Sequence, residues 1–123
     1  MGRLSKTQPE AIIQRHIVQY LWMQKEYFGF TVKNGGTFDP RIGQYRANSG
    51  AGYRRGVSDL VGAWNGQLFC IEVKTATGRL SEHQEKFRQD VIAAGGLHLV
   101  ARSVDDIVNW VAAMRLVAAR ETL

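Results

Sequence analysis

The residues between Val57 and Lys74 form two apolar-rich runs on either side of a polar turn, a pattern that predicts a β-hairpin. Its two apolar-rich runs are separated by Asn65-Gly66, the dipeptide that best fits a type I′ turn, because both central residues of that turn need a positive φ. A two-residue turn fixes the register and places Asp59 opposite Glu72. Since both faces of the hairpin are mostly apolar, we expect it to lie at the centre of a sheet that is covered on both sides.

Patterns elsewhere in the chain predict further elements on both sides of this hairpin. Strands are expected at 28–32, at 97–101 and, as an edge strand, at 44–48. Helices are expected after Thr7, over 82–94 and after Ser103. Together these elements predict a single α/β domain over residues 1–123, with a mixed sheet of four to five strands and helices on both of its faces.

Capping signals support the expected ends of two helices. Ser81 is a strong N-cap with Gln84 as its capping-box partner, and Gly95-Gly96 ends the same helix in the left-handed manner. Thr7 and Glu10 show the capping-box spacing at the first helix. At about 100° per residue, Glu10 falls within about 20° of the apolar stripe on the helical wheel, so we expect it to face the core.

Composition narrows the class of protein without identifying it. The hydrophobic content of 45% and the charged content of 22% are ordinary for a globular domain. No apolar run is long enough to span a membrane, and there is no signal-peptide pattern, so we expect a cytoplasmic protein. The single cysteine, Cys70, excludes an intramolecular disulfide and argues against a zinc cluster. The net charge of +5 favours an anionic partner.

Charged residues interrupt one face of the hairpin and carry its candidate chemistry. Asp59, Glu72 and Lys74 share that face at one end of the hairpin. Two opposed carboxylates repel each other unless something neutralises them, and a divalent cation such as Mg²⁺ or Mn²⁺ would do so. The alternative is a solvent-exposed hairpin end with a Glu–Lys pair and an unrelated aspartate.

The segment from Lys33 to Gly56 is rich in glycine and interleaves arginines with tyrosines. Such a composition suits phosphate contacts and base stacking, and we expect Arg46, Arg54 and Arg55 to contact a nucleic-acid backbone. A solvated loop is the alternative. Of the histidines, His98 is expected to be a satisfied core residue, and His83 is a weaker candidate for a phosphate contact.

Asp59 followed by Glu72-Val73-Lys74 matches the D…ExK core of the PD-(D/E)XK nuclease superfamily. Ordered blocks at 56–60, 71–74, 78–84 and 93–96 resemble the compact phage and bacterial branch of the VRR-NUC family. The similarity covers roughly residues 10–107. One departure is Ser58, where the superfamily's name carries a proline, and that position suggests no obvious chemical contribution.

This resemblance implies metal-dependent hydrolysis of DNA phosphodiesters. Asp59 and Glu72 would bind Mg²⁺ or Mn²⁺, assisted by Glu10 and the Val73 carbonyl, and Lys74 would orient the attacking water. The resemblance also implies that Gln84 lines the active site. A purely capping role remains the alternative for both Gln84 and Glu10.

Stand-alone VRR-NUC proteins of this size resemble Holliday-junction resolvases, which implies branched or four-way DNA as substrate and a homodimer. The apolar residues Trp110, Met114 and Val117 of the last helix could form the dimer interface or could pack on the sheet. Two other readings stay open: a nucleic-acid-binding module without catalysis, and a structural component of a phage or mobile-element assembly.

Overall fold

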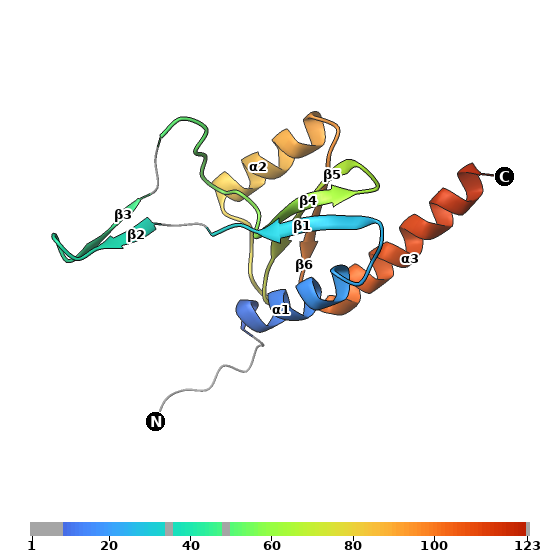
Figure 1. Ribbon diagram of the computed structural model, residues 1–123, viewed down its shortest axis with the longest axis horizontal. Coiled ribbons are helices and arrows are strands. Elements are labelled where there is room, and N and C mark those ends of the chain that lie inside the picture. Colours follow the sequence, from blue (N-terminus) through green and yellow to red (C-terminus); the bar gives the residue numbers. More distant parts are fainter. Residues whose placement is uncertain (1–8, 34–35, 48–49, 123) are drawn as a thin grey trace, which may run out of the picture.

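Four strands form the main sheet of this computed structural model, which describes residues 9–33, 36–47 and 50–122, with the backbone alone at 36–38 and 45–47. The strand order is β1 (Tyr27–Thr31), β4 (Leu60–Trp64), β5 (Gln67–Val73), β6 (Leu97–Ala101). Helix α2 (Glu82–Ala93) covers one face, and α1 (Glu10–Leu21) and α3 (Val104–Glu121) cover the other (Figure 1). The expected α/β architecture is thereby confirmed.

The hairpin β4–β5 lies at the centre of this sheet, as expected. Asn65 has φ 49° and Gly66 has φ 81°, the left-handed pair that a type I′ turn requires. Trp64 pairs with Gln67, and Leu60 pairs with Ile71, which is the predicted register. β1 extends the sheet antiparallel to β4, and β6 extends it parallel to β5.

The main core lies between this sheet and the helices α1 and α3. The period of two sends alternate hairpin side chains to this layer, where all are buried: Leu60, Trp64, Phe69, Ile71 and Val73. They meet a buried stripe from the two helices, made of Ile13, Ile17, Leu21, Ile107 and Val111. Fully burying an aliphatic or phenyl side chain of this kind contributes about 1.5–3 kcal/mol, so this layer holds the molecule together.

The opposite face of the sheet contains a buried polar pair. Ser58 is fully buried, and its Oγ lies 3.0 Å from Nε2 of His98 in β6. Ser58, for which the sequence suggests no obvious chemical contribution, therefore makes a structural contact with β6. His98 is only half satisfied, because its Nδ1 is buried with no hydrogen-bond partner in the described part of the chain. Burial lowers the pKa of His98 to about 4, so the ring is neutral near pH 7.

Helix ends follow the predicted signals at both ends of α2 and at the start of α3. The Ser81–Gln84 capping box is present, and Gly95 and Gly96 donate to the Ile92 and Val91 carbonyls in a Schellman motif. The Ser103 side chain caps α3. Helix α1 begins at Glu10 with Pro9 as its N-cap and no side-chain cap, so the predicted Thr7–Glu10 capping box is wrong: Glu10 is the first helical residue and not the third. Thr7 itself lies outside the described residues. No helix in the described ranges is long and apolar enough to cross a membrane.

A second, two-stranded sheet projects from the body as an arm (Figure 1). Its strands are β2 (Gly36–Asp39) and β3 (Gln44–Ala47). The edge strand expected at 44–48 therefore pairs within the arm and does not extend the main sheet. The chain leaves the main sheet after β1 and returns at β4, and the Val32 N–H donates to the Asp59 carbonyl at 2.8 Å where the two ends meet.

Candidate active site

Asp59 and Glu72 lie at the end of the hairpin from which the arm also departs. Asp59 directly precedes β4 and is partly buried, whereas Glu72 lies within β5 and is only 3% exposed. The Asp59 carboxylate accepts a hydrogen bond of 2.7 Å from the Val73 N–H, which holds it across the strand end from Glu72. The predicted pairing of the two carboxylates is thus brought about by the register and by this hydrogen bond.

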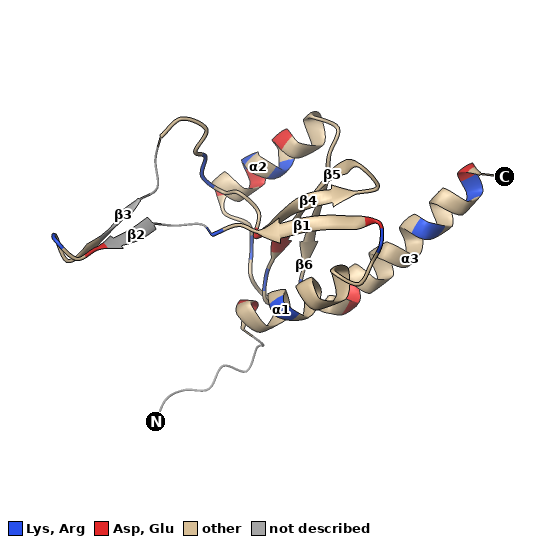
Figure 2. Cartoon of the chain, viewed as in Figure 1, with Lys and Arg blue, Asp and Glu red and all other residues tan. Residues whose placement is uncertain are grey.

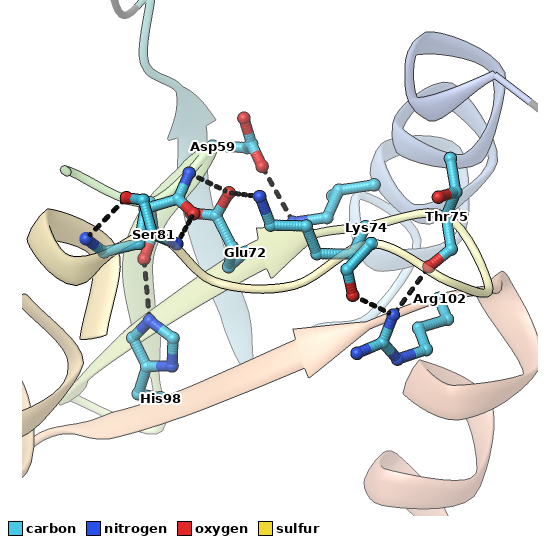
Figure 3. Close-up of polar contacts among 11 residues, drawn as sticks. Asp59, Glu72, Lys74, Thr75, Ser81, His98 and Arg102 are labelled. Carbon is cyan, nitrogen blue, oxygen red and sulfur yellow. Dashed lines mark hydrogen bonds and ion pairs between the residues drawn. The ribbon is translucent and has the colours of Figure 1, made fainter.

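The Glu72 carboxylate is held between an amide and an ammonium group (Figure 3). Gln84 Nε2 donates to Glu72 Oε2 at 3.0 Å, and Lys74 Nζ lies 3.8 Å from the same oxygen. The other oxygen, Oε1, is buried and has no hydrogen-bond partner among the described residues. A buried carboxylate oxygen without a partner is costly unless a ligand or cation completes its surroundings.

Burial, and after it the negative charge of nearby Asp59, raise the pKa of Glu72 to about 8. Lys74 acts in the opposite direction, and Glu10 adds a weak repulsion. Near neutral pH this site therefore favours either a proton or a metal ion on Glu72. The prediction that the two carboxylates repel each other in the bare protein agrees with this shift.

The residues present fit a divalent cation that retains water and binds substrate oxygens. Two carboxylates, one with an unpartnered oxygen, are the ligands that Mg²⁺ uses together with phosphate and water. Within the described ranges, no three His, Cys, Asp or Glu side chains come close enough together to hold a metal by themselves. The structure therefore does not bring Glu10 together with Asp59 and Glu72.

Glu10 does not face the core. It is the first residue of α1 and its side chain is exposed. Its charge is still felt at Glu72, as the smallest of the contributions to the Glu72 pKa. Its role as a third ligand, and that of the Val73 carbonyl, stay predictions.

Gln84 makes one contact that fits each of the two roles expected for it. Its Oε1 accepts from the Ser81 N–H at 2.9 Å, which closes the capping box, and its Nε2 donates to Glu72. One side chain therefore starts α2 and orients a carboxylate of the site. Because an amide has both a donor and an acceptor end, glutamine can make these two contacts at once.

Arg102 stabilises the turn beside the site and is not among the residues expected from the sequence. Its Nη1 donates to the Thr75 carbonyl at 2.6 Å and to the Gly78 carbonyl at 2.7 Å, so it holds the turn that follows Lys74 (Figure 3). The signal that could have found it is the parallel register: Val73 pairs with Ala101, which places Arg102 level with Lys74.

The predicted DNA-contacting arginines differ in their surroundings. Arg54 Nη2 forms an ion pair of 2.8 Å with Asp90, and its guanidinium lies 5.2 Å from the Phe87 ring centroid. Arg55 is exposed and lines a pocket at the start of α2. The side chain of Arg46, in β3, lies outside the described part of the chain.

Comparison with known protein families shows to which family this chain belongs. The VRR-NUC domain family matches the chain over residues 5–105, a range that includes the hairpin, α2 and β6. A comparison with curated proteins gives no match. The match spans Asp59, Glu72 and Lys74, so the D…ExK set identified from the sequence falls within the family's own domain. The chain therefore belongs to the VRR-NUC family, and its fold is that of a nuclease-type domain with a PD-(D/E)XK-like core.

Proposed function

We propose that this protein is a metal-dependent endonuclease that hydrolyses phosphodiester bonds in DNA. The observation that carries the proposal is the buried Glu72 carboxylate, with Oε1 unpartnered and Asp59 beside it. A protein that only bound nucleic acid would gain nothing from a repelling carboxylate pair at the end of its central hairpin.

Each residue of the site has a separate task in this proposal. Bound at Asp59 and Glu72, Mg²⁺ or Mn²⁺ would act as a Lewis acid and lower the pKa of water. Lys74 orients the attacking water and stabilises negative charge as it develops on the phosphate. Gln84 fixes the orientation of Glu72 through the 3.0 Å hydrogen bond. Arg102 keeps Lys74 in place by holding the turn after it.

Positive charge near the site supports DNA as the substrate. Lys and Arg residues lie along the segments that enter and leave the arm (Figure 2), and the net charge of the chain is +5. Arg54 and Arg55 are candidates for phosphate contacts. Arg54 pairs with Asp90 through Nη2 and its side chain is 40% exposed, so its remaining N–H groups can donate to a phosphate while the ion pair is kept. Arginine pairs readily with phosphate, and this contribution to binding weakens as salt concentration rises.

The proposed substrate is branched DNA, a four-way junction in particular, cut by a homodimer. A two-fold axis would relate two active sites to two opposing strands. Trp110 stacks on Phe69 at 4.4 Å and Met114 packs on the core, so these two side chains are already used within one subunit. Leu116 and Val117 are 65% and 50% exposed in the half of α3 that extends beyond the sheet, and we propose these as the interface.

A cleavage assay with and without Mg²⁺ tests the hydrolysis. Glu72→Gln and Lys74→Ala are expected to lower the cleavage rate by about 100-fold to 1,000-fold, as loss of a charge-stabilising group does. Lys86→Ala is the matched control, because it removes one exposed lysine of α2 without touching the site. Cleavage by folded Glu72→Gln at the wild-type rate would overturn the assignment.

Light scattering and a choice of substrates test the dimer and the junction preference. The wild type is expected to be a dimer at micromolar concentration, and Val117→Glu a monomer with reduced junction cutting. A monomeric wild type that cuts junction, flap and linear duplex equally would contradict the resolvase proposal. It would leave the proposal of a general DNA nuclease intact.

A further inference from the structure

A pocket of about 260 Å³ lies where the segment 53–57 meets the start of α2. Tyr53 and Arg55 line it from the segment, and Ser81, His83 and Gln84 line it from the helix. Gln84 also donates to Glu72, so the pocket adjoins the carboxylate site through a shared side chain. The pocket and the carboxylate site are therefore neighbours.

Two contacts hold the segment in the shape that forms the pocket. Arg54 is fixed to α2 by its ion pair with Asp90 and by its position over Phe87. Gly56 has φ +77° and packs so closely that an added Cβ would meet the His83 carbonyl and come within 2.7 Å of the Gln84 nitrogen. The segment is therefore anchored on both sides of Arg55, whose side chain is left exposed.

The polar side chains at this end of α2 divide between two neighbouring surfaces. Arg55 and His83 line the pocket, whereas the acidic residues Glu82 and Glu85 line a second groove with Lys86, on another side of the same helix start. The positive end of the α2 dipole adds to the preference of this end of the helix for an anion. An exposed aromatic ring, Tyr53 at 40%, lies beside these groups.

We propose that this pocket binds one unpaired nucleotide adjoining the scissile phosphate, with its phosphate at Arg55 and its base against Tyr53. A volume of about 260 Å³ lies near the lower limit of small-ligand sites, so the pocket admits a single nucleotide and excludes a duplex. Stacking on an aromatic ring with an arginine at the phosphate is how single-stranded nucleic acids are bound.

This inference rests on the proposed function and deepens it. A base in an intact duplex is paired and stacked, so it could enter the pocket only after leaving the helix, which costs free energy. A nucleotide at a branch or flap is already unpaired. The pocket therefore selects DNA in which the nucleotide beside the cut is free, and it disfavours continuous duplex.

Binding measured in EDTA tests the pocket separately from cleavage. The probes are a nicked duplex that carries a one-nucleotide flap and the same nicked duplex without the flap. Arg55→Gln is expected to weaken flap binding by about tenfold and to reduce the slope of log K against log salt by about 0.7–0.9. Arg120→Gln, near the far end of α3, is the control for the loss of one charge and should change neither.

Variants of Tyr53 provide a second test of the pocket. Tyr53→Ala is expected to weaken flap binding about tenfold and to leave binding of the unflapped duplex within twofold, while Tyr53→Phe, which keeps the ring, binds like the wild type. Equal losses on both probes, or equal effects of Arg55→Gln and Arg120→Gln, would overturn the pocket. If the flap preference is found but Mg²⁺ gives no cleavage, the pocket stands and the proposed hydrolysis falls.

Discussion

At the scale of single residues, Glu72 is the group whose state depends most on what is bound. Its folded pKa is about 8, against an ordinary value of 4.5. Between these values the folded protein keeps a proton that the unfolded chain releases. The free energy of unfolding of the metal-free protein therefore falls as pH rises through this window.

Glu72→Gln should remove that pH dependence. Glutamine keeps an acceptor for the Gln84 amide and carries no charge, so we expect the metal-free variant to be more stable than the wild type. The difference should grow from pH 5 to pH 9 and reach the order of a few kcal/mol. Thermal unfolding in EDTA measures it. Parallel curves for the two proteins across this range would show that Glu72 ionises as easily in the folded state as in the unfolded one.

The positions of site residues could be predicted from the sequence where they depend on residues nearby in the chain. The Asn65-Gly66 turn fixes the register, and the register brings Asp59 to Glu72, so these positions followed from the sequence. The different surroundings of Arg54 and Arg55 did not, because they depend on Asp90 and Phe87 in a helix far along the chain. The partner of Ser58, His98, is equally distant in sequence.

At the scale of elements, α2 joins folding to chemistry through its first turn. Gln84→Glu should separate the two roles of this residue. A glutamate keeps the acceptor of the capping box, but it replaces the donor that faces Glu72 with a second carboxylate. We expect cleavage to fall more than tenfold while the helix content by circular dichroism stays at the wild-type value.

Gln84→Ala provides the comparison. It removes the acceptor as well as the donor, so it should lower both cleavage and the melting temperature. If Gln84→Glu cleaves DNA as fast as the wild type, the contact with Glu72 has no part in the reaction.

A bidentate ion pair between Arg115 of α3 and Glu26 connects this helix to the turn before β1. Arg115 Nε and Nη2 donate to the two Glu26 oxygens, each at 2.8 Å, and hold the pKa of Glu26 at about 2. The stabilisation is present above the ordinary pKa of 4.5 and is lost as pH falls towards 2. Glu26→Gln should therefore lower stability at pH 6 and make little difference at pH 2.

Denaturant titrations of the wild type and Glu26→Gln at the two pH values check this. Arg115→Gln should behave in the same way, since it removes the other partner. If the free energy of unfolding of Glu26→Gln is as far below that of the wild type at pH 2 as at pH 6, the charge of Glu26 is not the source of the stability.

At the scale of the whole molecule, one core joins the sheet to α1 and α3, and it should unfold as a unit. Ile107 is fully buried in this core, whereas the next residue, Val108, is 37% exposed. Ile107→Ala is expected to lower the free energy of unfolding by about 2–5 kcal/mol, and Val108→Ala by about 0.5 kcal/mol or less. Urea titration followed by circular dichroism measures both. Similar losses in the two variants would contradict the assigned core.

The global arrangement was predictable in part. The strong periodicity of apolar residues predicted the strands, the helices and their arrangement in layers. Capping residues predicted both ends of α2 and the start of α3. The pairing of β3 with β2 had no comparable signal, because the segment 33–56 is poor in apolar residues and has no clear period. The exposure of Glu10 depends on where α1 begins, and its predicted cap Thr7 lies outside the described residues.

The hydrogen bond between Val32 and Asp59, where the arm leaves and rejoins the sheet, has a consequence for how such proteins can diversify. Strand pairing fixes the two ends of the segment that forms the arm. The entropy cost of closing this segment into a loop rises only logarithmically with its length. Doubling that length would cost only about 0.6 kcal/mol. Insertions, deletions and new tips can therefore accumulate in the arm while the carboxylates behind it keep their geometry. A lineage of these proteins can in this way vary the arm without rebuilding the carboxylate site.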